Sequence, residues 1–457
     1  MGTTEQIAEF VVETSYNSIP GEAVKRAKDA IMDGLGVTLA GTIEPVSRII
    51  TEYVKEMGSA PQAGVIGCGF RSSAPHAALA NGTMAHALDY DDVLSLMTGH
   101  PTVPVLPVVL ALGEVQHSSG KDVLGAYILG VEVEARLGAG IGRRHYAVGW
   151  HSTATLGTLG AAAAAAKIMG LNVTETRVAL GIAASKAGGL RQNFGTMTKP
   201  FHAGNAARNG IIAAMLAQKG FTADESILES QFGFCVVLGG EGEYDLERMT
   251  ESLGKQFAIV EPGLDMKPYP CCRFTHRCID AMLHIVEEHH PVAEEVVEIE
   301  CQTGPATANI LIHHQPKTPL EGKFSMEYCM ARALMDGEMK IAQFDKEKVL
   351  EPGAQELLQK VKYVHPEREE GQRAPEVVTV RLSDGRQYSQ EVLFAKGSPE
   401  QPMSAEELID KYRDCALVVL PEEAVERSLE LVAHLDKLKD ITELTDLLTS
   451  KVTPVRG

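Results

Sequence analysis

The sequence predicts a mainly α-helical fold in which a large helical body is interrupted by a smaller α+β module. Ala and Gly are abundant and there is one Trp, so small side chains can bring helices close together. Apolar residues recur at helical spacing through most of the chain. After about residue 266 the spacing of apolar residues changes to the alternating pattern of strands, and helical spacing resumes after Gly397. We therefore predict a helical domain formed by residues 1–266 and 397–457, with an α+β module at 267–396.

The helical body is predicted from periodicity and capping signals. The segment EAVKRAKDAIMDGLGVTLAG, from Glu22 to Gly41, carries apolar residues at helical spacing. The run from Ala161 to Met169 is almost entirely alanine, which predicts a central helix packed on all sides. A capping residue followed three positions later by Glu predicts a helix start. This pair occurs at Asn172 and Glu175, at Thr222 and Glu225, and at Ser404 and Glu407.

The inserted module carries strand and hairpin signals. The segment EEVVEIECQT alternates like a half-buried strand. Two further alternating runs flank Asp384-Gly385, which predicts a β-hairpin. The segment FSMEYCMARALMDG, which lies between the predicted strand and the predicted hairpin, is expected to form a helix. A chain of 457 residues also exceeds the roughly 250–300 at which single cores stop growing, which favours two domains.

Charge and composition exclude several classes of partner. The net charge of −19 disfavours nucleic acid and anionic membrane surfaces. The sequence contains no run of about 18 apolar residues, so no membrane span is predicted. Glu5 and Glu9 lie in the N-terminal segment, where a signal peptide needs positive charge. We expect a cytoplasmic protein. Eight Cys without a C-x-x-C pair, and no H-E-x-x-H, indicate buried thiols rather than a zinc site.

Two candidate proton-transfer segments lie close together in the sequence. Asp89, Asp91 and Asp92 fall within four residues, and carboxylates that repel one another suggest either acid/base work or a solvated helix end. His100 follows in a loop stiffened by two prolines, where a histidine serves either proton transfer or structure. A third segment places His151 just before the alanine-rich helix. The amides there would attract a carboxylate, with Trp150 as a wall, or simply form a hydroxyl-rich cap.

Basic residues form a second group of candidates. Thr198, Lys199 and His202 lie in a glycine-flanked segment that fits carboxylate binding, or a basic surface patch. Arg273 can hold a carboxylate through two parallel hydrogen bonds, or be structural. Lys267 precedes it beside two prolines. No dinucleotide-binding G-x-G-x-x-G follows a strand, and neither a Walker loop nor a G-x-S-x-G elbow is present.

The motifs taken in order resemble the MmgE/PrpD family. The HPT loop, the WHST loop, TKP-x-HAG, KPYPCC and FSMEYC follow one another along nearly the whole chain. That family includes methylcitrate dehydratases, cis-aconitate decarboxylases and iminodisuccinate epimerases. The resemblance implies a large helical domain built from both chain ends, an α+β lid domain and a homodimer. It also implies catalysis without metal or organic cofactor.

The resemblance also implies an active site between the two domains. Its five matching catalytic positions are Asp89, His100, His151, Lys199 and Tyr328. Val93 departs from the pattern, because the decarboxylases have Thr at this position and the methylcitrate dehydratases have D-T-W where this chain has Asp92-Val93-Leu94. Tyr328 would be a proton donor from the lid, or a buried phenol.

These assignments lead to one predicted chemistry, a proton transfer next to a carboxylate of a small di- or tricarboxylate. His151 would be the base and His100 its partner acid, while Asp89 would orient a histidine. We predict a cofactor-independent lyase. The alternatives are an epimerase of an iminodisuccinate-like amino dicarboxylate and a non-catalytic carboxylate-binding protein. The residues expected to bind substrate are Arg273, Lys267, His202, Thr198 and Asp92.

Overall fold

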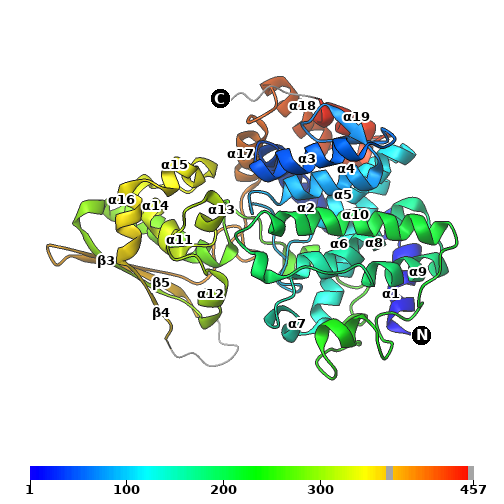
Figure 1. The fold of residues 1–457 in the computed structure, drawn as a ribbon, viewed down its shortest axis with the longest axis horizontal. Coiled ribbons are helices and arrows are strands. Elements are labelled where there is room, and N and C mark those ends of the chain that lie inside the picture. The colour runs from blue at the N-terminus through cyan, green and yellow to red at the C-terminus, as the bar shows by residue number, and fades with distance from the viewer. Residues whose placement is uncertain (367–373, 451–457) are drawn as a thin grey trace.

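The computed structural model describes residues 1–366 and 374–450 and contains two bodies that lie side by side (Figure 1). The larger body is built from helices, and the smaller one carries a sheet flanked by helices. The predicted fold class, mainly helical with a smaller α+β part, is confirmed. The domain boundaries remain a prediction.

Five helices form the centre of the larger body. They are α4 (Ala74–Ala85), α5 (Thr102–Gln116), α6 (Gly120–Ile141), α8 (Ser152–Met169) and α10 (Thr198–Gln218). The alanine-rich part of α8 is buried, as predicted. Helices α4 and α10 cross closely because both have glycine at the contact. A Cβ built on Gly82 would lie only 2.8 Å from Cα of Gly204.

Both chain ends belong to the larger body. Ile7 and Leu448 lie in the same hydrophobic core. The surrounding elements are α1 (Thr3–Glu13), α2 (Gly21–Gly41), α3 (Pro45–Met57), β1 (Ala63–Val65), β2 (Phe70–Ser72), α7 (Arg143–Ala147), α9 (Val173–Ala184), α17 (Ala405–Ala416), α18 (Glu422–Ala433) and α19 (Thr442–Thr449). The C-terminal helix α17 packs on α2, so the chain returns to its first domain after the smaller body.

The smaller body is a four-stranded mixed sheet with its own core. Its strands are β3 (Val296–Gln302), β4 (Val361–Val364), β5 (Glu376–Leu382) and β6 (Gln387–Val392), in the order β4-β3-β5-β6. Only the β3–β4 pair among them is parallel. The predicted hairpin is confirmed, and Gly385 adopts φ 90° in its turn. The helices are α11 (His276–His289), α12 (Pro305–Ile310), α13 (Pro319–Gly322), α14 (Met326–Asp336), α15 (Lys346–Val349) and α16 (Pro352–Leu357).

Two of the three predicted helix starts are confirmed. Asn172 and Ser404 each form a reciprocal capping box with the Glu three residues later. The third prediction, at Thr222 and Glu225, is wrong, because this segment forms turns rather than a helix. Three residues after Glu225, the Leu228 amide donates a hydrogen bond of 3.1 Å to the hydroxyl of Thr4.

The cysteines and the helix lengths agree with the sequence predictions. All eight cysteines are free thiols, and every one except Cys68 is buried. Within the described residues, no helix combines the length and the apolar character needed to cross a bilayer.

Candidate active site

A small cavity of about 60 Å³ lies where the two bodies meet. It gathers six of the residues predicted from sequence, together with an aromatic and apolar wall. The predicted residues are Asp89, His100, His151, Lys199, Lys267 and Arg273, and the wall includes Val93, Tyr146, Phe194, Phe274, Ile310 and Phe324. Three larger cavities, of about 150, 340 and 480 Å³, do not bring two histidines together with a lysine. The chemistry therefore points to the smaller cavity.

Asp89 is the anion at the centre of this cavity. It lies in the turn after α4 with φ 51°, a left-handed conformation that aspartate tolerates better than most residues. Its Oδ1 accepts hydrogen bonds from Lys199 at 2.8 Å and from Lys267 at 3.0 Å. Burial raises the pKa of Asp89, but the two ammonium groups outweigh it and hold the pKa well below its ordinary value. The carboxylate is therefore charged at neutral pH.

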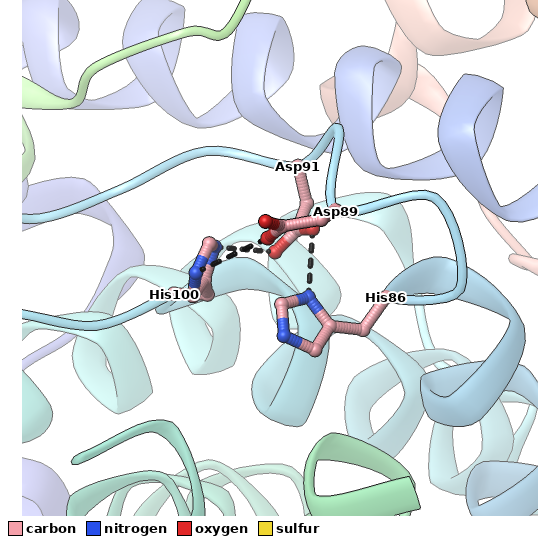
Figure 2. Close-up of side chains that lie close together, drawn as sticks. All are labelled: His86, Asp89, Asp91 and His100. Atoms are coloured by element: carbon pink, nitrogen blue, oxygen red, sulfur yellow. Dashed lines mark hydrogen bonds and ion pairs between the residues drawn. The ribbon is translucent and has the colours of Figure 1, made fainter. Parts of the chain in front are cut away.

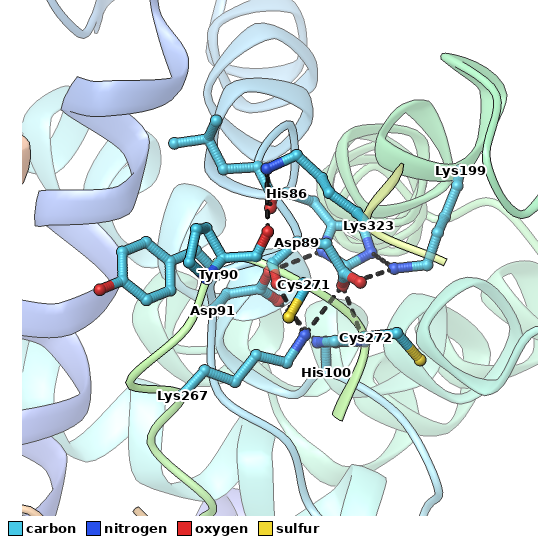
Figure 3. A network of polar contacts seen from close by, with 12 residues as sticks. His86, Asp89, Tyr90, Asp91, His100, Lys199, Lys267, Cys271, Cys272 and Lys323 are labelled. Carbon is cyan, nitrogen blue, oxygen red and sulfur yellow. Dashed lines mark hydrogen bonds and ion pairs between the residues drawn. The ribbon is translucent and has the colours of Figure 1, made fainter. Parts of the chain in front are cut away.

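Lys199 also contacts His86, which fixes the tautomer of that imidazole (Figure 3). Nζ of Lys199 lies 2.8 Å from Nε2 of His86, and Nδ1 of His86 lies 2.8 Å from Oδ1 of Asp91. An ammonium only donates, so Nε2 of His86 accepts and Nδ1 donates. Burial lowers the pKa of His86 to about 4, so the ring is neutral. Lys199 uses two hydrogens on Asp89 and His86 and keeps a third for the cavity.

His100 lies against the same two carboxylates (Figure 2). Its Nδ1 is 2.9 Å from the Asp92 carbonyl oxygen and 2.9 Å from Oδ2 of Asp91, while Nε2 is 3.6 Å from Oδ1 of Asp89. Burial lowers the pKa of His100 despite Asp91. Burial also raises the pKa of Asp91, but His86 and His100 outweigh it and the pKa falls well below the ordinary value. His100 is thus a neutral imidazole beside a charged, buried carboxylate.

His151 borders the cavity at the N-terminus of α8. Its backbone amide donates to the Gly189 carbonyl at 2.9 Å, and its ring meets Phe194 edge to face at 5.0 Å. Its Nδ1 lies 3.0 Å from Nδ1 of His202. Burial lowers the pKa of His151 well below the ordinary value, and Lys199 adds to the effect. An uncharged histidine in this place is able to accept a proton.

Three lysines hold the turn that carries Asp89, and two of them, Lys267 and Lys323, are labelled in Figure 3. Successive carbonyls accept one hydrogen bond each: Leu88 from Lys323 at 3.0 Å, Asp89 from Lys267 at 2.8 Å, and Tyr90 from Lys411 at 2.8 Å. Lys323 belongs to the smaller body and Lys411 to α17, so three distant parts of the chain fix this turn. All three lysines are buried.

Family models match both parts of the chain. The MmgE/PrpD N-terminal domain matches residues 5–247, and the MmgE/PrpD C-terminal domain matches residues 269–437. The chain belongs to the MmgE/PrpD family. This confirms the resemblance read from the motifs.

Curated MmgE/PrpD relatives point to one class of activity. Cis-aconitate decarboxylase of Mus musculus is 31% identical over 97% of this chain and 93% of its own length. The enzyme of Homo sapiens is 30% identical over 99% and 95%, and that of Aspergillus terreus is 29% identical over 99% and 96%. These similarities support a carboxylate lyase.

Arg273 is the third cation of this MmgE/PrpD cavity. Its guanidinium forms an ion pair of 2.7 Å with Asp265. The backbone of Asp265 in turn pairs with Val93, through hydrogen bonds of 2.9 and 2.8 Å. Val93, the position that departs from the decarboxylase pattern, therefore lies both on the cavity wall and next to the strand-like segment that holds Arg273.

Four other residues predicted for the MmgE/PrpD site do not line the cavity. Tyr328 is buried in the smaller core, where its hydroxyl donates to the Gln343 carbonyl. Thr198 is exposed at the start of α10. His202 lies behind His151, with its Nδ1 on that ring. The fourth residue that does not line the cavity is Asp92.

Asp92 faces the core of the larger body rather than the cavity. Its carboxyl accepts from the hydroxyl of Thr102 at 2.6 Å and from the Thr102 amide at 3.3 Å. Burial raises the pKa of Asp92 to about 8, so it is protonated at neutral pH. Trp150 stacks on His145 at 6.4 Å and does not line the cavity, whose wall is Phe194 and Phe324 instead.

His86 and Asp91 belong to the site, although neither was among the catalytic or binding residues predicted from sequence. Both belong to the segment from His86 to Asp92, in which only Asp89 and Asp92 were predicted to be catalytic or binding residues. The spacing was an available signal, because His86 lies three residues before Asp89 at the end of a helix. Which of the neighbouring carboxylates face the cavity depends on the turn after α4, whose left-handed residue no local pattern predicts.

The same cluster has the residue types of a metal site. Ligand atoms of His86, Asp89, Asp91 and His100 lie within 4.8 Å of one another. However, Lys199 lies 2.8 Å from both Asp89 and His86, and Lys267 lies 3.0 Å from Asp89. A divalent cation placed there would be repelled by two ammonium groups at close range. The residues therefore fit an ammonium-neutralised carboxylate better than a metal.

Proposed function

We propose that this protein is a cofactor-independent lyase that acts on a small di- or tricarboxylate, with decarboxylation of a cis-aconitate-like acid as the first candidate. The observation that carries the proposal is Asp89, whose carboxylate is shared by Lys199 and Lys267 beside the uncharged His151. The relatives named cis-aconitate decarboxylases favour decarboxylation over dehydration.

Three cations would bind the substrate carboxylates. Lys199 and Lys267 each use two ammonium hydrogens within the protein and retain one for the cavity. Arg273 is held by Asp265 at 2.7 Å, and a substrate carboxylate would compete for its planar pair of donors. Phe194 and Phe324, whose ring centroids are 5.6 Å apart, would pack against the carbon skeleton. These three cations supply local attraction for a substrate anion in a chain whose net charge is −19.

The proposed chemistry passes through a carbanion next to a carboxylate. In decarboxylation the C–C bond breaks, carbon dioxide leaves, and the electron pair stays on carbon until a proton arrives. In dehydration His151 removes a proton from carbon and a β-hydroxyl leaves. His100 was expected to be the acid. Because burial lowers its pKa, the ammonium of Lys199 is the better proton donor at neutral pH.

The test is proton NMR in deuterium oxide with a panel of di- and tricarboxylates that includes cis-aconitate. If carbon dioxide leaves, we expect deuterium to replace it on carbon, and if water leaves, we expect the signals of an alkene product without required deuterium entry. Binding of every acid without exchange or turnover would instead favour the non-catalytic carboxylate-binding protein.

Epimerisation is the second candidate, and a specific observation favours it. His100 and His151 both line the cavity, so two proton-transfer groups are available, one to remove the substrate hydrogen and the other, once protonated, to return a proton on the opposite face. An iminodisuccinate-like amino dicarboxylate would then exchange its α-hydrogen for deuterium without net loss of mass. The same NMR experiment separates this outcome from a lyase.

We also propose that the chain is a homodimer, as the family resemblance implies. Phe232 and Val237 are large apolar side chains with 84% and 63% of their surface exposed, which is consistent with a covered face in an assembly. Sedimentation velocity is the measurement, and a single monomeric species at micromolar concentration would contradict the proposal.

A further inference from the structure

We propose that His202 is a positioning residue that fixes the tautomer of His151, so that the bare Nε2 of His151 faces the substrate. This inference rests on the proposed role of His151 as base. It assigns His202 a role different from the substrate binding expected from sequence. The geometry behind it is the 3.0 Å approach of the two Nδ1 atoms.

A hydrogen bond between two Nδ1 atoms requires one hydrogen between them. Both rings are neutral, because burial lowers the pKa of His151 well below its ordinary value and that of His202 to about 4. The groups with the largest electrostatic effects on the pair are Lys199, His86 and His100, and the anion of the cavity, Asp89, is bound to Lys199 and Lys267. Either His151 donates and its Nε2 is bare, or His202 donates and Nε2 of His151 carries the hydrogen.

The surroundings of the cavity favour the first arrangement. His151 shares the cavity wall with Lys199, Lys267 and Asp89, and among these the ammonium of Lys199 has the largest electrostatic effect on its ring, so its outer nitrogen lies in a positive field. A lone pair directed into that field is stabilised, whereas an N–H dipole is not. His202 then accepts at Nδ1 and carries its own hydrogen on Nε2.

The backbone is shaped for this contact. A Cβ on Gly189 would lie 2.5 Å from Cβ of Ala154 and 3.2 Å from Nδ1 of His202, so a side chain there would push the ring away. The carbonyl of Gly189 accepts the His151 amide at 2.9 Å. His202 is also one helical turn after Lys199 on α10, which places the support behind His151 and the ammonium beside it.

The arrangement gives a balanced proton step. Nε2 of His151 takes the proton from substrate carbon, the C–H electron pair stays on carbon, and the imidazole becomes an imidazolium. The Nδ1 hydrogen stays on His151 and its bond to His202 becomes charge-assisted. No second proton moves. A neutral imidazole as acceptor also keeps His151 uncharged at rest, whereas a carboxylate there would raise its pKa.

The experiment is nitrogen NMR of the full chain labelled with ¹⁵N-histidine, with His151 assigned through loss of its signals in His151→Gln. We expect the Nδ1–H tautomer of His151 in the wild type, its retention in His202→Asn, whose amide oxygen accepts, and its loss in His202→Leu. An Nε2–H tautomer in the wild type, or an unchanged tautomer in His202→Leu, would overturn the proposal.

Kinetics give a second readout that a purely structural role would not produce. We expect His202→Leu to lower kcat about 100-fold with little change in KM, and His202→Asn to restore most of it. His202→Asp should move the acid limb of kcat/KM to higher pH. Because the tautomer is read without turnover, a protein that is inactive on every carboxylate would refute the proposed function and leave this assignment testable. If His202→Leu fails to fold, the wild type and His202→Asn still decide it.

Discussion

The ammonium group of Lys199 lies 2.8 Å from the carboxylate of Asp89, and both groups are buried although 110 residues separate them in the chain. A buried anion of this kind is stable only while its partners remain charged. Lys267 provides the second partner at 3.0 Å. The same ion pair therefore stabilises the cavity between the two bodies and provides groups for the proposed reaction.

Removal of the Lys199 ammonium should abolish most turnover. In Lys199→Met we expect kcat to fall about 100-fold or more, because the proposed proton donor is lost. Steady-state kinetics on the substrate found by NMR is the measurement. Lys219→Met is the matched control, since Lys219 is exposed at the other end of α10. Turnover near the wild-type level in Lys199→Met would rule out this role.

The pH profile should reflect the lowered pKa of His151. Protonation inactivates a base, so activity falls as pH drops through the pKa of the base. Because burial holds the pKa of His151 well below the ordinary value of 6.5, kcat/KM should stay level well below that pH. Profiles of kcat/KM from about pH 5 to pH 9 give the answer. An acid limb at or above the ordinary histidine value would contradict the assignment.

Asp92 should make the protein less stable as pH rises. The pKa of Asp92 is about 8 in the folded protein, above the ordinary 3.8 that it has in the unfolded chain. Its contribution to the free energy of unfolding is therefore complete below about pH 3.8 and is lost as the pH rises to about 8. In Asp92→Asn this loss should disappear. Urea unfolding at several pH values should show a stability advantage for Asp92→Asn that grows from mildly acidic to mildly basic pH. A difference that does not depend on pH would disprove this explanation.

Lys411 should be a strong stability determinant without direct contact with substrate. Its Nζ bonds to the Tyr90 and Lys267 carbonyls at 2.8 Å each and to Asp33 at 2.6 Å. Lys411→Met leaves the buried carboxylate of Asp33 unpaired, which should cost about 3–5 kcal/mol of the free energy of unfolding. The double variant Asp33→Asn with Lys411→Met should recover part of this loss. Denaturant unfolding measures both, and a loss below about 1 kcal/mol in the single variant would refute the clamp.

Arg273 should affect binding more than chemistry. In Arg273→Lys the planar pair of donors is lost but the charge remains, so we expect KM to rise about tenfold and kcat to stay within a few-fold. Asp265→Asn is the companion variant, because it releases Arg273 from its ion pair and should lower KM. An equal fall of kcat and kcat/KM in Arg273→Lys would instead place Arg273 in the transition state.

The sequence by itself determined local secondary-structure elements and most of the functional groups that the cavity contains. Asn172 and Ser404 start helices because their caps bond within three residues. The turn at Asp384-Gly385 specifies a hairpin in the same local way. The prediction at Thr222 was wrong, because this segment forms turns, and the nearby Leu228 amide bonds to Thr4, 224 residues away in the chain. The motifs also named six of the residues that line the cavity.

Only the tertiary structure decided which of these side chains meet. Lys267 reaches Asp89 across 178 residues, a contact that depends on how the two bodies pack and not on any local pattern. The same packing buries the Tyr328 hydroxyl against Gln343 and turns Asp92 toward Thr102, so both leave the cavity. It also brings His86 to Lys199 and His202 to His151. Local sequence sets the conformation of a segment, but the direction of a side chain relative to distant segments follows from the burial of the whole core.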